Sequence, residues 1–488
     1  MQSKELNCYY QTLIIGAGPA GLAAAMELSE TGKDFCVIEK SDQVGGLAKT
    51  YVIWEGDLEF RTDNGPHRFF SKNQYLYDFI GSILGEHWIA VERHTQQYVD
   101  GVFLDYPVNV IQVLRSFSPF FVCRIFIDYL WAVVQYKVFR KKMLNFYDYA
   151  VANFGKTLAD FNILGYTEKI WGIPSPDIHA DWAKQRITGL NIRSLIKNLI
   201  EKNLFGKGKG IKTLVDEFYY PDSGSGLVYE AIKGKLEVRG YSIFTLSQPV
   251  TVFHDGRRIK KVSLEIGDKT QEVEVENLIE SVHVVDFLKL LNPLPPEEVL
   301  AAARRLKYRS QVYLFVTLNK ERVSQNQWIY FPDKQIPFAR ISEMKNFSPK
   351  MAPPGKTSLF IEFFCNEGDE IYQKTKEELF ELAMPYLEGK FFSRAEVRHY
   401  YLFRGSKDYP LYNLNYEKNL AVIKDYLDSF ENLYYIGRPG RFKYTNQDHS
   451  LEMGILAAKG VMDGKKIDMD DIGAEQEYFE KGYHKNKK

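Results

Sequence analysis

A glycine-rich turn near the N-terminus restricts the fold of this 488-residue chain more than any other feature. Residues 11–15 form a short apolar run, and GAGPAG follows at 16–21. An Ala/Leu-rich stretch then runs from 22 to 28, and a second apolar run, FCVIE, occupies 35–39. Two short apolar runs separated by a helical stretch predict a strand, a helix and a second strand. We therefore expect the chain to begin with an α/β unit.

Three glycines in this turn, Gly16, Gly18 and Gly21, form G-x-G-x-x-G between the expected strand and helix. In that motif the first glycine permits the tight turn, the second lets a pyrophosphate approach the backbone, and the third lets helix and strand pack closely. Glu39 ends the second strand, where its carboxylate can accept hydrogen bonds from a ribose. The pattern predicts a dinucleotide site. Its expected contacts are Gly16, Gly18, Pro19, Ala20, Gly21, Glu39 and Lys40.

A second glycine pair, Gly45 and Gly46, lies six residues beyond Glu39 and precedes Leu47. This added glycine-rich turn near the phosphates favours FAD over NAD. The extension resembles the large family of FAD enzymes that includes amine oxidases, protoporphyrinogen oxidases, phytoene desaturases and UDP-galactopyranose mutases. The resemblance implies an α/β fold with a Rossmann-like FAD-binding domain of the GR2 type. Because no Cys or His here is in a pattern typical of covalent attachment, we expect non-covalent FAD.

The composition excludes several other classes of protein. Hydrophobic residues make up 45% of the chain and charged residues 26%, which supports a sizeable core and excludes a disordered chain. Lys+Arg and Asp+Glu both number 63, so the chain lacks the basic excess of a nucleic-acid binder. The four cysteines form no CxxC pair and no zinc-ligand spacing, so we expect no metal site. The N-terminus lacks a signal-peptide pattern, and we expect a cytoplasmic location.

One segment, residues 116–142, is rich in apolar residues. Arg124 and Asp128 interrupt it, so it lacks the roughly 18 uninterrupted apolar residues of a spanning helix. Two alternatives remain. The segment is a buried or half-buried helix, or it is a helix on the membrane surface with its basic end, 137–142, towards lipid headgroups. The second alternative would place the protein at the inner face of the membrane.

The remaining sequence predicts discontinuous domains. Helical patterns dominate from about 73 to 210, and alternating stretches typical of sheet occur at 241–279, 311–319 and 357–364. A strand and an Ala-rich helix near the C-terminus can rejoin the first unit. We expect an FAD-binding domain at 1–72, 211–300 and 431–465, an inserted helical domain at 110–210, a mixed or antiparallel substrate-binding sheet domain at 73–109 and 301–430, and a charged tail at 466–488.

Five further segments resemble UDP-galactopyranose mutases, in the same order along the chain. They are DNGPHRFFSKN (63–73), GVFLDYPVN (101–109), GYTEKIWGIP (165–174), PDKQIPFARISEMKNFSP (332–349) and GRPGRFKYTNQDHSLEMG (437–454). The resemblance implies further cofactor contacts from Gly65, Pro66, His67, Gly437, Arg438, Asn446, Gln447, Asp448 and Ser450.

The same resemblance implies which residues bind a sugar nucleotide. Arg340 is the leading cation for the diphosphate, because a guanidinium binds it with a bidentate fork and does not titrate. Its alternative is a surface salt bridge. Arg193 and Arg186 lie near the position of the mutase loop arginine, and Arg193 is the substrate-binding candidate.

Aromatic and imidazole side chains complete the expected site. Tyr444 and Asn446 are the expected contacts to the diphosphate, and Trp171 would line the sugar or base pocket. His67 would lie beside the flavin ring and tune its redox state. Tyr444 and Trp171 have core packing as their alternative, and His67 a structural role. His449 is left unassigned, since packing or a flavin hydrogen bond suits it as well as acid–base work. The expected catalytic residues are His67, Arg340 and Tyr444.

The leading functional hypothesis is a non-redox exchange between the pyranose and furanose forms of a nucleotide-linked sugar. By the resemblance, reduced FAD would act through N5 as the nucleophile, with NAD(P)H or a reductase as electron source. The first alternative is an FAD-dependent oxidoreductase of the amine oxidase, protoporphyrinogen oxidase or desaturase type. The second is an FAD-containing scaffold without catalytic activity in a polysaccharide or membrane-associated assembly.

Overall fold

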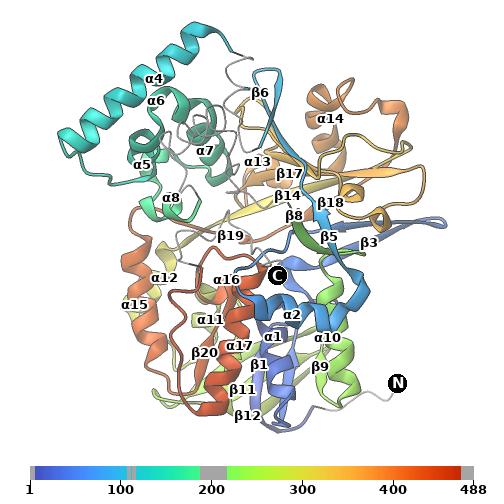
Figure 1. Ribbon diagram of the computed structural model, residues 1–488. Coiled ribbons are helices and arrows are strands. Elements are labelled where there is room, and N and C mark those ends of the chain that lie inside the picture. The colour runs from blue at the N-terminus through green and yellow to red at the C-terminus, as the bar shows by residue number, and fades with distance from the viewer. Residues whose placement is uncertain (1–5, 107–111, 113–116, 187–216, 474–488) are drawn as a thin grey trace, which may run out of the picture.

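The computed structural model describes residues 6–106, 112, 117–186 and 217–473 (Figure 1). Within these ranges, two eight-stranded sheets form the body of the protein. Figure 1 shows the first sheet and its helices in the lower half, the second sheet above it, and a group of helices, α4 to α8, beside the second sheet. Three structural units therefore meet near the middle of the molecule.

The first sheet has β1 near its centre, parallel to β12 on one side and β2 on the other. Each residue of β2 is buried, because parallel strands covered on both faces consist of continuous apolar runs. Its strands are β1 (Tyr9–Ile15), β2 (Phe35–Ile38), β9 (Ser242–Phe244), β10 (Ser247–His254), β11 (Ile259–Ile266), β12 (Lys269–Glu280), β13 (Leu291–Asn292) and β20 (Leu433–Tyr435).

Small residues let the helices pack closely against this sheet and against one another. A Cβ on Gly454 of α17 would lie only 2.0 Å from the carbonyl oxygen of Ala20 in α1, so these two helices are in backbone contact. This unit holds α1 (Pro19–Ser29), α2 (Gln74–Leu84), α10 (Leu227–Val238), α11 (Val284–Leu290), α12 (Glu297–Arg305), α16 (Gly437–Gly440) and α17 (Gln447–Asp463).

The second sheet is mostly antiparallel, in the order β18-β14-β17-β16-β15-β6-β7, with β19 paired to β14. Helices α13 (Glu370–Gln373) and α14 (Lys376–Leu387) contact it. Its strands are β6 (Thr95–Val99), β7 (Val102–Asp105), β14 (Lys307–Leu318), β15 (Trp328–Tyr330), β16 (Arg340–Ser342), β17 (Thr357–Cys365), β18 (Val397–Arg404) and β19 (Tyr409–Leu411). Two ribbons, β3 (Thr50–Glu55) with β4 (Leu58–Asp63) and β5 (Trp88–Glu92) with β8 (Glu217–Pro221), lie outside both sheets.

The helical unit begins with a long helix, α4 (Pro119–Val133), which continues into a π-helical turn at Val134–Val138. The Ser118 side chain caps α4 by accepting a hydrogen bond from the Phe121 N–H. Gly155 lets the next helix cross α4 closely, since a Cβ there would lie 2.7 Å from the Tyr129 nitrogen. The remaining helices are α5 (Phe146–Phe154), α6 (Lys156–Leu158), α7 (Gly165–Trp171) and α8 (Ala180–Arg186).

Three segments differ from the expected domain limits. Helix α2, expected in the sheet domain, packs against α10 and α17 of the first unit. Helix α15 (Tyr416–Asp428), expected in the sheet domain, packs against α12 beside the first sheet. The tail was expected to begin at 466, but Met469 is only 3% exposed and Asp470 forms ion pairs with Lys424 and Arg441. A buried apolar side chain and paired charges anchor this stretch. Residues 474–488 of the expected tail lie outside the described residues.

The structure confirms the expected fold class, a Rossmann-like α/β domain combined with a mixed or antiparallel sheet and helices. Within the described ranges, none of the helices combines the length and the apolar character needed to cross a bilayer.

Candidate functional site

A cavity of about 1140 Å³ lies where the three units meet. Both glycine-rich turns of the first unit, one face of the second sheet and the inner side of the helical unit contribute to its wall. Typical small-molecule pockets measure roughly 300–1,000 Å³, so this cavity has room for a cofactor together with a substrate.

The first glycine turn has the backbone that its sequence predicts. Gly16 has φ +99°, which a side chain would disfavour, and its N–H donates to the carbonyl of Ile38 across 2.8 Å. A Cβ on Gly21 would lie 1.9 Å from the Gly16 oxygen, so this glycine allows helix and strand to approach. A Cβ on Gly18 would meet one atom within 4 Å, the Gly46 Cα at 3.8 Å, and the residue faces the cavity.

Glu39 sits at the end of β2 and lines the same cavity. Its two carboxylate oxygens accept hydrogen bonds from the Ala17 N–H across 2.7 Å and the Ser41 N–H across 2.8 Å. These bonds fix the carboxylate beside the first turn and leave lone pairs for a ribose hydroxyl. The geometry fits the expected cofactor contact.

The second glycine turn packs directly on the first. The Gly45 N–H donates to the Ala17 carbonyl across 2.8 Å, and a Cβ on Gly46 would lie 3.2 Å from the Gly18 Cα. Side chains at Gly18 and Gly46 would therefore fill the space between the two turns. The backbone forms an open cradle of the kind that a diphosphate requires.

His67 lines the cavity, and its Nδ1 lies 3.0 Å from the Gly65 carbonyl oxygen. Burial, assisted by the guanidinium of Arg438, lowers the pKa of His67 to about 3. The ring is therefore neutral, with Nδ1–H donating to the carbonyl, and Nε2 is left as an acceptor. This geometry suits a neutral hydrogen-bonding role beside a flavin and rules out a permanent imidazolium.

Arg340 also lines the cavity, but its environment differs from the expected one. Its Nε and Nη2 donate to the two carboxylate oxygens of Glu362, the latter across 2.7 Å. Arg340 and Glu362 are cross-strand partners on β16 and β17, and Glu362 is only 1% exposed. The alternative of a surface salt bridge is wrong, because the partner carboxylate is buried. The expected contact of Arg340 with a diphosphate stays a prediction.

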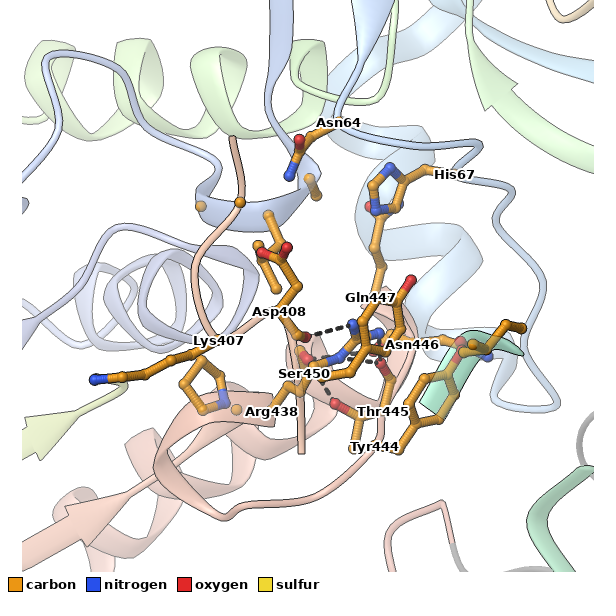
Figure 2. Close-up of a pocket in the computed structure, with 18 of the residues that line it drawn as sticks. Asn64, His67, Lys407, Asp408, Arg438, Tyr444, Thr445, Asn446, Gln447 and Ser450 are labelled. Atoms are coloured by element: carbon orange, nitrogen blue, oxygen red, sulfur yellow. Dashed lines mark hydrogen bonds between the residues drawn. The ribbon is translucent and has the colours of Figure 1, made fainter. Parts of the chain in front are cut away.

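Tyr444 and Arg438 belong to an aromatic–cation stack in the cavity wall (Figure 2). The Arg438 guanidinium lies 4.8 Å from the centroid of the Tyr444 ring and 5.2 Å from that of Tyr409. The two tyrosine rings stack at 5.6 Å with an interplanar angle of 17°. Arg438 also donates to the Thr445 carbonyl, which holds this loop against the stack. Core packing and exposure to the cavity thus occur together at Tyr444.

The NQDHS segment begins helix α17, with Asn446 as its N-cap. The Asn446 N–H donates to Nδ1 of His449 across 3.2 Å, and the Asn446 side chain accepts from the His449 N–H. Burial lowers the pKa of His449 to about 3, so its ring is neutral. Asp448 is buried outside the cavity wall, so its expected cofactor contact is not seen.

Trp171 ends helix α7 and is 2% exposed, yet it lines the cavity. Its ring meets that of Trp182 edge to face at 4.6 Å. The Trp171 Nε1–H has no hydrogen-bond partner among the described residues. A buried donor of this kind is costly unless a ligand or water accepts from it. Trp171 is thus a core residue that also lines the cavity, and its contact with a sugar or base stays a prediction.

Asp286 and Asp408 line the cavity but were not among the expected site residues. Asp408 is 3% exposed and accepts a hydrogen bond from the Tyr313 hydroxyl across 3.4 Å. Burial raises the pKa of Asp408 to about 7, although Arg438 opposes that change. In the sequence the only signal is an acidic residue directly before Tyr409, just after strand β18, and a lone acid in a loop does not stand out.

The other expected cofactor contacts divide into two groups. Gly21, Gly45 and Gly65 shape the backbone behind the cavity without lining it. Arg193 lies outside the described residues, and Arg186 is the last residue of α8. The expected cofactor and substrate residues that line the cavity are Gly16, Gly18, Pro19, Ala20, Glu39, Lys40, Gly46, Leu47, Pro66, His67, Trp171, Arg340, Gly437, Arg438, Tyr444, Asn446, Gln447 and Ser450.

Comparisons with known proteins agree with this architecture. Residues 14–83 match the family model described as an NAD(P)-binding Rossmann-like domain, and residues 297–395 match the one described as UDP-galactopyranose mutase. A crystal structure of reduced UDP-galactopyranose mutase superposes with a TM-score of 0.81 at 23% identity, covering 97% of both chains. The chain is UDP-galactopyranose mutase-like in fold.

Curated relatives of this chain include a probable mutase and several L-amino acid oxidases. A probable UDP-galactopyranose mutase from Klebsiella pneumoniae is 26% identical over 175 residues, which is 36% of this chain and 44% of the relative. The L-amino acid oxidase bordonein-L from Crotalus durissus terrificus is 25% identical over 331 residues, or 63% of this chain and 58% of the relative. The chain thus spans about half the length of both relatives. The expected resemblance to a mutase within a wider flavoenzyme family is confirmed.

Proposed function

We propose that the mutase-like chain catalyses a non-redox exchange between the pyranose and furanose forms of a nucleotide-linked sugar. The observation that carries this proposal is that one cavity is lined both by the two glycine-rich turns and by Arg340, Arg438 and Tyr444. One part suits a dinucleotide and the other a second diphosphate. The match of residues 297–395 to the mutase family model supports the same reaction class.

The residues of the two turns fit non-covalent FAD. The open backbone at Gly18 and Gly46 would face the pyrophosphate, and Glu39 would accept from the ribose. When bound and reduced, FAD supplies an electron-rich N5 that can act as a nucleophile towards an anomeric carbon. The chain's own residues then have to hold the departing diphosphate near the sugar and exclude water.

Three side chains are placed for that holding task. Arg438, which the resemblance implies as a cofactor contact, lies over Tyr444 and donates to the carbonyl oxygens of Thr445 and Asp408. We propose that it also faces the diphosphate of the substrate. Arg340 is fixed in the sheet by Glu362, and among the described residues its Nη1 makes no hydrogen bond. A guanidinium held by a carboxylate is pre-organised, so little side-chain freedom is lost when a phosphate binds. The neutral His67 can accept a hydrogen bond without adding charge beside the flavin.

The test is anaerobic incubation of the dithionite-reduced, FAD-loaded protein with a panel of nucleotide sugars, followed by product chromatography. The proposal expects ring isomers only after reduction, with no reductant consumed per product. Steady oxygen uptake coupled to substrate loss by the oxidised protein would instead support the second candidate, an oxidoreductase. That candidate is favoured by the L-amino acid oxidase match over 331 residues.

Two further parts of the proposal concern partners. A flavin that must stay reduced needs an electron source, and we propose NAD(P)H or a reductase. We also propose a cytoplasmic protein that associates with the inner face of the membrane through residues 116–142, where an apolar helix is followed by basic residues.

A further inference from the structure

Helix α4 is apolar on both of its sides. Its buried side, which includes Ile125 and Tyr129, packs towards α5 and α6. Its opposite side exposes Phe120, Ile127 and Trp131, which are 78%, 66% and 57% exposed. The exposed Arg124 interrupts this outer side, since it lies three residues before Ile127. A helix with apolar side chains on both sides is typically covered by apolar material on both. Figure 1 shows α4 at the outer edge of the molecule, with the rest of the helical unit on one side of it.

The inner side of α4 forms one end of the large cavity. We call this end the apolar wing and define it by eight lining residues that carry only hydrocarbon side chains. They are Val122, Ile125, Phe126, Phe146, Phe154, Leu158, Ile163 and Ile170. The wing is continuous with the part of the cavity that contains Arg340, Arg438 and Tyr444, because all belong to the same cavity. Trp171 and Thr167 line the wall as well.

The chemistry of the apolar wing limits what can fill it. A nucleobase carries several hydrogen-bonding groups, and burying each without a partner costs free energy. The eight side chains that define the wing offer no such partner. A hydrocarbon chain gives up no hydrogen bonds when it enters the wing, and burial of its apolar surface is favourable. The wing therefore suits a long apolar chain better than it suits a nucleoside.

The edge of the wing connects it to the outside. Phe126 lines the cavity and is nevertheless 43% exposed, so the wing reaches the surface at α4. Lys137, Arg140 and Lys142, which follow α4 in the chain, are exposed. Apolar side chains beside cations are complementary to an anionic lipid surface. A chain that leaves such a surface at α4 would enter the wing directly.

We propose that the site binds a lipid-linked diphosphate, with its apolar chain in the wing and its diphosphate at Arg438 and Arg340. This inference rests on the proposed function and adds a second substrate class, in which a long hydrocarbon chain replaces the nucleoside. The cations of the cavity match the anionic head, and the eight hydrocarbon side chains match the tail. The apolar outer side of α4 would let such a substrate pass from a lipid surface into the wing.

Calorimetric titration of the FAD-loaded protein tests the inference without relying on turnover. The probes are farnesyl diphosphate, a saturated alkyl diphosphate of similar length, uridine diphosphate and inorganic diphosphate. We expect farnesyl diphosphate to bind at least tenfold more tightly than inorganic diphosphate. Comparison with the saturated chain separates an isoprenoid preference from a general preference for hydrocarbon. Equal affinity for farnesyl diphosphate and inorganic diphosphate would overturn the inference.

Two substitutions in the wing and one control locate the chain. Val122→Trp fills the wing from α4, and Leu158→Gln adds a polar group from α6 without a large change in volume. Each should remove most of the advantage of farnesyl diphosphate and leave the affinity for inorganic diphosphate unchanged. Ile127→Ser, on the outer side of α4, should change neither affinity. If Val122→Trp lowers the melting temperature or FAD content, the affinities of Leu158→Gln alone decide whether the chain lies in the wing. Unchanged farnesyl diphosphate binding in a folded wing variant would contradict the placement.

The outcome is separable from that of the proposed function. Ring exchange of nucleotide sugars without preferential binding of farnesyl diphosphate would leave the proposed function standing and remove the lipid-linked substrate. Tight, wing-dependent binding of farnesyl diphosphate without ring exchange of any sugar diphosphate would support the lipid-binding site and contradict the proposed function.

Discussion

Arg340 and Glu362 face each other across β16 and β17 and form a two-point ion pair in the wall of the cavity. Glu362 is almost fully buried, and the positive charge of Arg340 stabilises its carboxylate. The guanidinium thus has a structural partner and also borders the space where a diphosphate would bind. Two roles in one residue make single substitutions ambiguous, and a pair of substitutions resolves them.

Replacement of Arg340 should affect both stability and ligand binding. Arg340→Ala leaves a buried carboxylate unpaired, which costs about 3–5 kcal/mol of unfolding free energy. Arg340→Ala/Glu362→Gln removes that carboxylate charge and should recover much of the loss in a urea titration. Loss of the charged hydrogen bond should lower nucleoside diphosphate affinity roughly ten- to a hundredfold in both variants. If the double variant regained full affinity, Arg340 would be structural only.

Gly18→Val should release FAD while leaving the fold intact. A Cβ at Gly18 meets one atom within 4 Å, so the new side chain occupies the space where the pyrophosphate would lie. Gly21→Ala is the matched contrast, because its Cβ would lie 1.9 Å from the Gly16 oxygen and should destabilise the protein itself. Flavin absorbance after gel filtration and melting temperature distinguish the two. Stoichiometric FAD in a folded Gly18→Val protein would refute the assigned cofactor site.

His67 should make the protein less stable in acid. Its pKa of about 3 lies below the ordinary value near 6.5, so the unfolded chain binds a proton that the folded protein does not. Its contribution is present above pH 6.5 and is lost as the pH falls towards 3, by up to about 1.4 kcal/mol per pH unit. His67→Gln should show a shallower loss over this range in urea titrations. An identical slope in both proteins would mean that His67 is protonated normally.

Asp408 should make the protein less stable at higher pH, the opposite of the effect expected for His67. Its pKa is raised to about 7, so the folded protein binds a proton that the unfolded chain has already released between about pH 4 and 7. Stability is therefore lost as the pH rises through that window. Asp408→Asn should be more stable than the parent protein at pH 8 and equal to it near pH 3.5. A destabilising effect at pH 8 would show that the ionised carboxylate has a favourable partner.

Association with a membrane should depend on the outer side of α4. Flotation with vesicles containing anionic lipid should carry the parent protein, and vesicles of phosphatidylcholine alone should carry less of it. Ile127→Ser/Trp131→Ser removes two exposed apolar side chains and should reduce flotation, whereas Val238→Ser, an exposed apolar residue on α10, should not. Flotation that is equal for all three proteins would contradict this surface.

Several elements of the fold and site follow from short stretches of sequence. The strand before the first glycine turn, the strand after the helix, the conformation of Gly16 and the position of Glu39 all lie within one short stretch, residues 9–39. Local geometry is therefore sufficient to predict them. The start of a helix within NQDHS also depends on neighbouring residues, although which of them is the N-cap, Asn446, was shown by the structure.

Contacts between distant segments required the folded structure. Glu362 pairs with Arg340 because the register between β16 and β17 brings them together. The sequence of neither strand predicts that register. Asp408 acquires its raised pKa from burial beneath two units of the protein, and α4 exposes an apolar side that hydropathy alone could not distinguish from a buried one. The local motifs depend on backbone conformation within a few residues, whereas burial, charge pairing and the shape of the apolar wing depend on which surfaces meet after folding.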